Sequence, residues 1–422
     1  MPRVLSVAVV NALGAVLLLL LNFLLARLTN EQAVGAYNIA WAWIEVLVVL
    51  GMLGFDKLAM RDVAYCLSHQ SWGKLRGLLI GSTAAITLSS LILASTTAVI
   101  AWRFLPSVYA PLLFASVLIG LTVVPMRALA FHLHAILIAM RRSLQAQIPM
   151  FIGQPLFTIV LVLGLILVFG REHLTGPNTV AASSISAFLV MVLSAIFCTT
   201  YLPKQIRSAQ SQYDFPAWIK IALPMMLIAS MSLINIRADI IMLGAFRSAD
   251  NAGVYAIASR LSEVIRFGAL AVNPVIVGLI ARHHATNEKE QLRKVIRISY
   301  KLLLLWSAIG LAMVMLFGSQ ILSLFGGGFQ IGYIPLLILA LGQFMTIALG
   351  PVDSILIMTG HHHAALAGLV VATIANITLN LMLIPMFGMA GAAIATATSA
   401  TLWSIILAAA VVKRLHFRPF AF

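Results

Sequence analysis

A few ionisable side chains stand inside the long apolar runs of this sequence, and they are the residues whose types and spacing could do chemistry. Arg127 lies in the middle of the apolar run 111–139. His134 and Arg141 follow it at seven-residue steps, which places all three on one helical face. If the run crosses a membrane, the arginine costs about 2.5–3.5 kcal/mol there and persists only beside a cavity or a partner. We predict that Arg127 and His134 line a cavity that binds an anionic substrate.

A second charged group lies in the run 252–281. Arg260, Glu263 and Arg266 follow one another at three-residue steps, within about a third of a helix circumference. Glu263 can pair with either arginine in the same helix, which would give a packed ionic cluster. Alternatively, Arg260 and Arg266 bind substrate and Glu263 takes part in ion coupling, because three charges in one span are costly for packing alone. The spacing leaves both interpretations open.

Three further positions are candidates for substrate binding or ion coupling. Arg237 and Asp239 lie near the outer end of one run, which favours an interfacial role, with substrate binding by Arg237 as the alternative. Glu45 lies in the middle of another run and is either a hydrogen-bonded structural carboxylate or a proton or sodium site. Asp353 follows the helix-breaking pair at 350–351, where a structural, gating or coupling role is open.

We predict no metal site, no bound cofactor and no enzyme active site. The three consecutive histidines at 361–363 cannot all face one ion easily and have no adjacent carboxylate. The glycines at 326–328 lack the preceding strand and the following Gly-Lys-Ser of a phosphate-binding loop. The two cysteines are far apart in sequence and support neither a disulfide framework nor a zinc site. The only ions that we expect the protein to use are H⁺ or Na⁺, coupled to transport.

Composition places these charges in a membrane. The 422 residues are 62% hydrophobic and 9% charged, with a mean hydropathy of +1.04. A soluble domain of this length cannot bury so much apolar surface. Twelve runs are long enough to cross a hydrocarbon core about 30 Å thick, and they lack the alternation of barrel strands. The expected fold is an all-α polytopic membrane protein with about twelve helices, over residues 4–26, 34–55, 77–102, 111–139, 144–169, 178–202, 217–245, 252–281, 295–317, 333–359, 364–385 and 389–412.

The basic residues predict the orientation. A formal charge of +15 could indicate a nucleic-acid partner, but the basic residues lie in the short gaps between apolar runs. With the N-terminus inside, 19 of the 27 lysines and arginines fall in cytoplasmic segments and four in outer ones. This is the positive-inside pattern, so we expect both termini in the cytoplasm and no nucleic-acid partner.

The sequence contains an internal repeat. Residues 35–46 and 253–264 share Gly, Tyr, Ile, Ala, Glu and Val at the same spacings. A same-direction repeat of half the chain predicts two similar six-helix lobes, over 1–210 and 211–422, with the substrate path between them.

The sequence of the predicted cytoplasmic loop 56–76 has the pattern of a short amphipathic helix. Met60, Val63 and Leu67 fall on one stripe, which predicts a helix lying in the headgroup layer and offers a landing site for lipid headgroups. Plain positive-inside anchoring is the alternative.

Several short motifs give the chain a family resemblance. The run Ala26-Arg27-Leu28 with Gly35-x-Tyr37, and the run Leu53-Gly54-Phe55-Asp56, resemble the first two spans of the multidrug/oligosaccharidyl-lipid/polysaccharide (MOP) exporter superfamily. Asp239-Ile-Ile-Met-Leu-Gly244 and Gly388-Met-Ala-Gly-Ala-Ala-Ile-Ala-Thr396 resemble its C-terminal half. The length of the chain and the sequence of its C-terminal half are most similar to those of the polysaccharide branch.

The resemblance implies a V-shaped, alternating-access flippase of the bacterial inner membrane. Its expected substrate is an undecaprenyl-pyrophosphate-linked oligosaccharide for O-antigen, capsule or exopolysaccharide, bound by Arg127, His134, Arg237, Arg260 and Arg266. A polysaccharide polymerase and a chain-length regulator are implied partners, besides membrane lipid. The main alternative is a cation-coupled multidrug antiporter, which should carry cavity carboxylates. A membrane polymerase should have a large outer loop, and every outer gap here is short.

Overall fold

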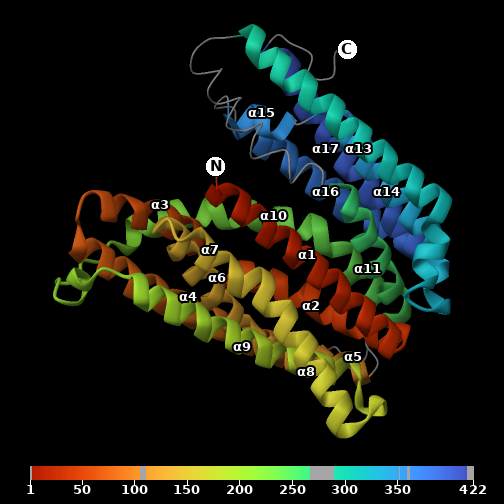
Figure 1. Ribbon diagram of the computed structural model, residues 1–422, viewed down its shortest axis with the longest axis horizontal. Helices are drawn as coiled ribbons and strands as arrows, with labels where there is room; N and C mark the ends of the chain where they lie inside the picture. The colour runs from red at the N-terminus through yellow and green to blue at the C-terminus, as the bar shows by residue number, and fades with distance from the viewer. Residues whose placement is uncertain (1, 105–110, 267–288, 351, 359–361, 416–422) are drawn as a thin grey trace. The chain divides into compact units, whose positions relative to one another are not determined.

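The computed structural model describes residues 2–104, 111–266, 289–350, 352–358 and 362–415, and every regular element within these ranges is a helix (Figure 1). Ten described helices are long and apolar enough to cross a membrane, or up to eleven if one bent pair counts as a span. The all-α polytopic membrane fold is thus confirmed. The predicted span 252–281 begins as α11, but its continuation from residue 267 lies outside the described residues.

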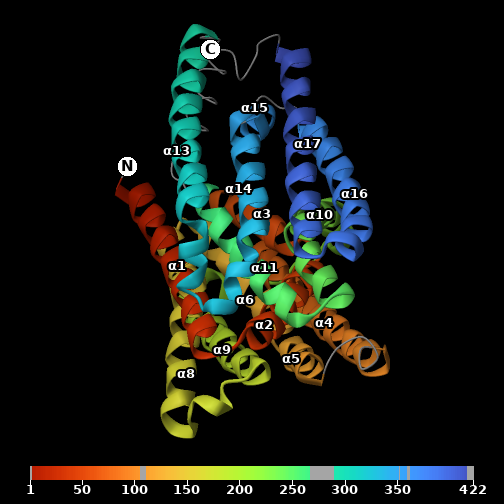
Figure 2. The ribbon, with the colours of Figure 1, turned by 90° about the vertical axis from the view of Figure 1, so that its right-hand side faces the viewer.

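The chain divides into two compact units, Met1–Leu233 and Ile234–Phe422. Unit 1 contains α1 (Pro2–Leu28), α2 (Glu31–Gly51), α3 (Phe55–Ser68), α4 (Trp72–Phe104), α5 (Pro111–Leu121), α6 (Val123–Ala139), α7 (Ser143–Gln147), a π-helix (Ile148–Gly153), α8 (Gln154–Phe169), α9 (Gly176–Tyr201) and the first part of α10 (Phe215–Phe246). Unit 2 contains the rest of α10, α11 (Ala249–Glu263), α13 (Lys289–Ser323), α14 (Tyr333–Ala348), α15 (Val352–Met358), α16 (His362–Phe387) and α17 (Met389–Leu415). In unit 2, α14 packs against α13 and α17, and α17 packs against α16 (Figure 2).

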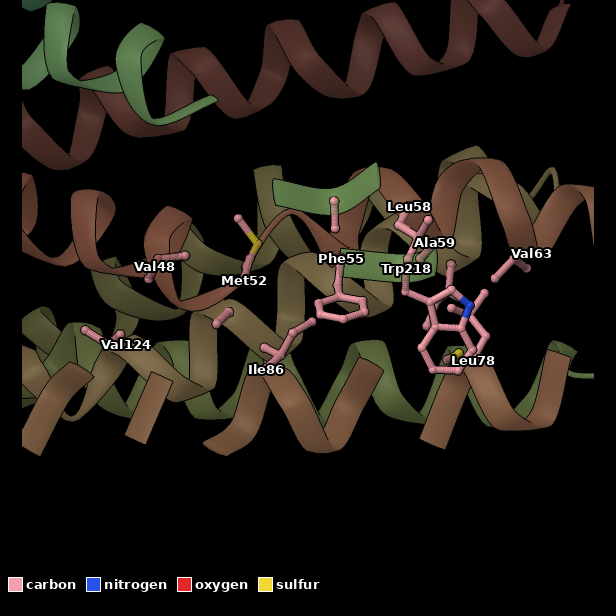
Figure 3. Packing of buried hydrophobic residues seen from close by; sticks show 14 of the residues in the cluster. Val48, Met52, Phe55, Leu58, Ala59, Val63, Leu78, Ile86, Val124 and Trp218 are labelled. Carbon is pink, nitrogen blue, oxygen red and sulfur yellow. The ribbon is translucent and has the colours of Figure 1, made fainter. Parts of the chain in front are cut away.

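The division between the units falls inside α10, whereas the sequence placed it before that helix, after residue 210. The first turns of α10 belong to unit 1 because Trp218 and Ala222 are buried in its hydrophobic core. In Figure 3 the Trp218 ring lies among side chains of α3 and α4, next to Leu78. Gly54 has a φ of 76°, and a Cβ added there would collide with the Ala222 carbonyl oxygen. Only glycine therefore permits this close approach of the two chain segments.

The segment that leads into α10 is also fastened to unit 1. The Arg76 guanidinium on α4 donates hydrogen bonds to the carbonyl oxygens of Arg207 and Ala209, at 2.8 and 2.7 Å. The backbone N–H of Gln212 donates to the Gly73 carbonyl at 3.0 Å. Bonds to a charged donor are stronger than neutral ones, so this connection forms part of the packed unit.

The two copies of the repeat begin two helices in the same way. Asn30 caps α2 by accepting from the Ala33 N–H at 2.9 Å, and Ser248 caps α11 by accepting from the Asn251 N–H at 3.3 Å. The offset between the caps equals the offset between the repeated tyrosines, Tyr37 and Tyr255, both of which are buried. The duplication therefore includes the helix starts and the buried face that follows.

The loop 56–76 does form a helix, α3, but the predicted lipid-facing stripe is not continuous, because Met60 is exposed whereas Val63 is buried. Val63 is fully buried, together with Phe55 and Leu58, because this face of α3 packs against α4 and α6 (Figure 3). The outward cations of α3 are paired, Lys57 with Asp56 at 3.4 Å and Arg61 with Asp62 at 2.6 Å. Paired charges leave little net attraction for anionic headgroups, so the landing-site interpretation loses its support.

The predicted helix break at 350–351 is present, and a second break separates α5 from α6. The bend of 41° between α5 and α6 lies at Thr122, three residues before Pro125, whose ring excludes the carbonyl of Leu121 from helical bonding. In the second half, α14 ends at Ala348 and α15 begins at Val352, with Gly350 at a φ of 86° between them. Asp353 is therefore in the first turn of α15, where it is half-buried.

Candidate functional site

Arg127 is held in unit 1 by aromatic rings from two helices. The side chain is buried, with 9% of its surface exposed. Its guanidinium carbon lies 4.6 Å from the centroid of the Trp41 ring on α2 and 5.2 Å from that of Phe131, one turn further along α6. Tyr37 stacks on Trp41 in turn, with centroids 5.8 Å apart and planes inclined by 20°. Cation–π contacts of this kind contribute about 0.5–2 kcal/mol each.

Glu45 belongs to the same face of α2. Tyr37, Trp41 and Glu45 follow one another at four-residue steps, so they form one row along the helix that packs against α6. Glu45 is half-buried there. The structure thus brings two predicted candidates, Arg127 and Glu45, to one helix pair.

The predicted cationic stripe along α6 ends at His134. The helix stops at Ala139, and Arg141 follows with a φ of 60° and an exposed side chain, so the third member of the stripe does not share the helical face. His134 is half-buried, and its ring centroid is 6.3 Å from that of Phe151 in the π-helix. The stripe prediction was therefore correct for Arg127 and His134 and wrong for Arg141.

Among the histidines whose burial the structure describes, the most deeply buried is His132, which the sequence interpretation did not single out. It has no exposed surface, and its Nε2 lies 2.9 Å from the Ser82 hydroxyl on α4. That hydroxyl also lies 2.6 Å from the Leu78 carbonyl oxygen, to which it donates. The histidine then donates through Nε2 and joins α4 to α6 as a structural residue. Its apolar neighbours at 128 and 136 were the available sign of burial.

Unit 2 holds a buried carboxylate, and both of its oxygens accept hydrogen bonds. Asp239 on α10 is 2% exposed. Its Oδ2 accepts from the Tyr255 hydroxyl of α11 at 2.6 Å and from the Thr396 hydroxyl of α17 at 3.1 Å. Its Oδ1 accepts from the backbone N–H of Ile240 at 2.8 Å. Arg237 is also buried, at 8% exposure, so both side chains of this pair are enclosed by protein.

Buried amides extend this polar group toward α16. The Ser399 hydroxyl, one turn after Thr396, donates to the Thr396 carbonyl at 3.1 Å and accepts from the Asn376 side chain at 3.0 Å. Asn380 donates to both the backbone and side-chain oxygens of Asn376, at 3.0 and 3.1 Å. We call the resulting set the Asp239 cluster: Asp239, Tyr255, Thr396, Ser399, Asn376 and Asn380.

The Asp239 cluster has the chemistry of a site for one small cation. The carboxylate supplies the charge, and the hydroxyls of Tyr255 and Thr396 that contact it supply uncharged oxygens, which suit a proton or a hard monovalent ion. The Oδ1 of Asn380 is buried and lacks a hydrogen-bond donor among the described residues. The sequence contained Asp239 as a visible intramembrane charge, but its partners come from three other helices and no local pattern connects them.

The three charged residues Arg260, Glu263 and Arg266 do not form one cluster. Arg260 and Glu263 form an ion pair of 3.2 Å within α11, with side chains 15% and 29% exposed. The packed alternative is thus observed for these two residues. Arg266 lies beyond them in a short 3₁₀ turn, Val264–Arg266, and is exposed. Arg127 and His134 therefore belong to unit 1, and Arg237, Arg260, Glu263, Arg266 and Asp353 to unit 2. Joint binding by Arg127 and Arg266 stays a prediction.

Two arginines that the sequence prediction places on the outer side act as helix caps. Arg171 donates to the carbonyl oxygens of Leu28 and Arg27 at the end of α1, at 2.9 and 2.6 Å. Arg247 donates to the Ile384 carbonyl of α16 at 3.2 Å. A cation at a helix C-terminus also complements the helix dipole. Cavities of about 500 and 410 Å³ open beside these two arginines, and none of the predicted site residues lines either cavity.

Comparison with known proteins agrees with this architecture. Residues 3–277 match the family of polysaccharide biosynthesis proteins. The chain is 29% identical over 187 residues to "Probable flippase AglR" of Haloferax volcanii, a match that covers 43% of this chain and 39% of that relative, so less than half of the relative's length is matched.

Solved structures establish the fold. The lipid II flippase MurJ, in an inward closed conformation, superposes with a TM-score of 0.77 at 16% identity, over 96% of this chain and 87% of that one. An inward-facing multidrug transporter of the MATE family of the MOP superfamily gives 0.75 at 14% identity, over 97% and 98%. At such low identity these likenesses show a shared fold, which is the MOP transporter fold that the sequence motifs predicted.

Proposed function

This chain belongs to the polysaccharide biosynthesis protein family, as its motifs predicted, and on that premise we propose that it is a flippase for a lipid-linked oligosaccharide. The substrate would be a glycan carried on a polyprenyl pyrophosphate, such as the undecaprenyl-linked repeat unit of O-antigen, capsule or exopolysaccharide. It would pass from the cytoplasmic to the outer leaflet. The names of the relatives support transport without covalent chemistry, since AglR is named a probable flippase and MurJ a lipid II flippase.

The observation that carries the proposal is the state of Arg127. It is a buried arginine in the middle of a span, held by two aromatic rings. Its planar fork matches two phosphate oxygens and stays charged at any accessible pH. A pyrophosphate that crosses a membrane loses its hydration, and a fixed guanidinium replaces part of it. In a multidrug antiporter, an arginine at this position would repel a cationic drug. The flippase is therefore the better supported of the two functions.

We assign ion coupling to the Asp239 cluster in preference to the three carboxylates named from the sequence. Glu263 is occupied by Arg260, and neither Glu45 nor Asp353 is enclosed to the same degree. The charged groups near Asp239 are Arg237 on its own helix, with Glu263 acting on the partner Tyr255. Binding of H⁺ or Na⁺ would neutralise the buried carboxylate, which gives the ion a way to bias the conformation of unit 2.

Complementation tests the function. Expression of this chain in a host that lacks its own flippase for a surface polysaccharide is expected to restore the polysaccharide at the cell surface. The control is the same host with an exporter of the multidrug branch, which should not restore it. If this chain instead confers resistance to cationic drugs and leaves the glycan inside, the antiporter is the correct assignment.

Cysteine labelling tests the predicted orientation in the inner membrane, with both termini in the cytoplasm. Cys66 is a poor reporter, because burial raises the pKa of its thiol, aided by nearby Asp62, and leaves little thiolate to react near neutral pH. A cysteine at the exposed position of Ala64 on α3 should react only with a membrane-permeant reagent. Glu172→Cys, in the exposed turn before α9, should react with an impermeant one. The opposite pattern would invert the topology.

The resemblance also implies protein partners for the proposed flippase. A polysaccharide polymerase would consume the exported repeat units, and a chain-length regulator would act with it. Both would engage the product in the outer leaflet, so their absence should leave flipping intact while lengthening of the glycan stops.

A further inference from the structure

The ring contacts of Arg127 connect α2 to the proposed pyrophosphate site. A lone arginine side chain has several rotatable bonds and pays up to about 2 kcal/mol of rotamer entropy when it is ordered. Here the guanidinium lies over Trp41 from the neighbouring helix and over Phe131 from its own. Stacking uses the flat faces of the guanidinium and leaves hydrogen bonding to the N–H groups at its edge.

We propose that Trp41 is a positioning residue for lipid-linked substrate, which fixes the plane of the Arg127 guanidinium so that its edge meets the phosphate oxygens. The inference rests on the proposed function and names the side chain that gives the site its geometry. Trp41 is in turn held by the stacked ring of buried Tyr37. The stacked rings of Tyr37 and Trp41 thus form a fixed surface. Because the guanidinium lies on this surface, Arg127 is ordered before substrate arrives.

Preorganisation of this kind has a measurable signature. If Trp41 acts through Arg127, removing its ring weakens substrate binding only while the guanidinium is present. Phenylalanine keeps a ring face for the guanidinium and should rescue most of the loss. A residue that merely fills the core would lower stability in the same way with or without the arginine, and would not show this dependence.

The test is binding of undecaprenyl pyrophosphate to the purified full-length protein in nanodiscs, measured by native mass spectrometry. Trp41→Leu is expected to bind about tenfold more weakly than wild type, and Trp41→Phe within about threefold of it. Adding Trp41→Leu to Arg127→Gln should cause no further loss. Trp102→Leu is the matched control, because Trp102 on α4 is 70% exposed and distant in sequence from the site, and it should bind as wild type.

Two results would overturn the positioning role while leaving the flippase in place. One is unchanged affinity of Trp41→Leu. The other is an equal loss in the presence and absence of the Arg127 guanidinium, which would mean that Trp41 contacts the lipid by itself. Failure of the wild-type protein to bind the pyrophosphate lipid is a different outcome. It would overturn the proposed substrate class, and the role of Trp41 with it.

Discussion

Asp239→Asn is expected to abolish export of the surface polysaccharide while the protein stays folded and at normal abundance. Asparagine has the same shape and can still accept from Tyr255 and Thr396 through its carbonyl oxygen. It carries no charge, so a cation or proton bound at the cluster loses its main partner. Export in the complemented host is the measurement, with the amount of membrane-inserted protein determined in parallel.

Two control variants separate coupling from structure at this cluster. Asp239→Ala leaves the buried hydroxyls of Tyr255 and Thr396 unpaired, and each such group costs about 1–3 kcal/mol, so this variant should also lose thermal stability. Tyr255→Phe keeps the carboxylate and should retain part of the export. Full export by Asp239→Asn would show that the carboxylate is only a hydrogen-bond acceptor, and the coupling assignment would then fail.

The double variant Arg127→Ala with Arg266→Ala is expected to lose export completely. Each arginine carries a planar cationic fork that can bind two phosphate oxygens at once. Lysine at both positions should restore part of the export, since the charge survives but the planar fork does not. Arg260→Ala should be milder for substrate binding, because its charge is already neutralised within α11.

Normal protein levels are required in every arm of this experiment, and surface polysaccharide is again the readout. Arg103→Ala serves as a matched control, because this arginine lies at the end of α4 and is exposed. Export at the wild-type level by the double variant, with the protein properly inserted, would mean that these charges are structural. The pyrophosphate assignment would then lose its main physical support.

Local patterns were sufficient for the class of protein and for most of the helices. Apolar length predicts spans because lipid requires each backbone bond to be satisfied within a segment, so the signal lies in consecutive residues. The repeat was visible in the same way, down to the residues that became buried in α2 and α11. Arg127 was found because one charge inside an apolar run is itself a local anomaly.

Tertiary packing decided what local patterns could not. The stripe on α3 was assigned to lipid, but a lipid-facing and a protein-facing stripe have the same composition, and only the position of α4 and α6 shows that Val63 packs inside. The unit boundary lies inside α10 for a similar reason, because Trp218 is an interfacial or a core residue according to its neighbours.

The candidate site shows the same limit most clearly. A charge in a span can be read from the sequence, but its role depends on which atoms surround it, and these come from distant segments. Hydrogen bonds join Asp239 to Tyr255 and Thr396 across three helices. Arg127 contacts Trp41 on a second helix, whereas Glu263 pairs with a residue of its own helix. The sequence by itself determined that these charges exist within the membrane. Only the packing of helices decided which are paired, which are enclosed and which are positioned by rings, because burial and hydrogen bonding are properties of the folded neighbourhood.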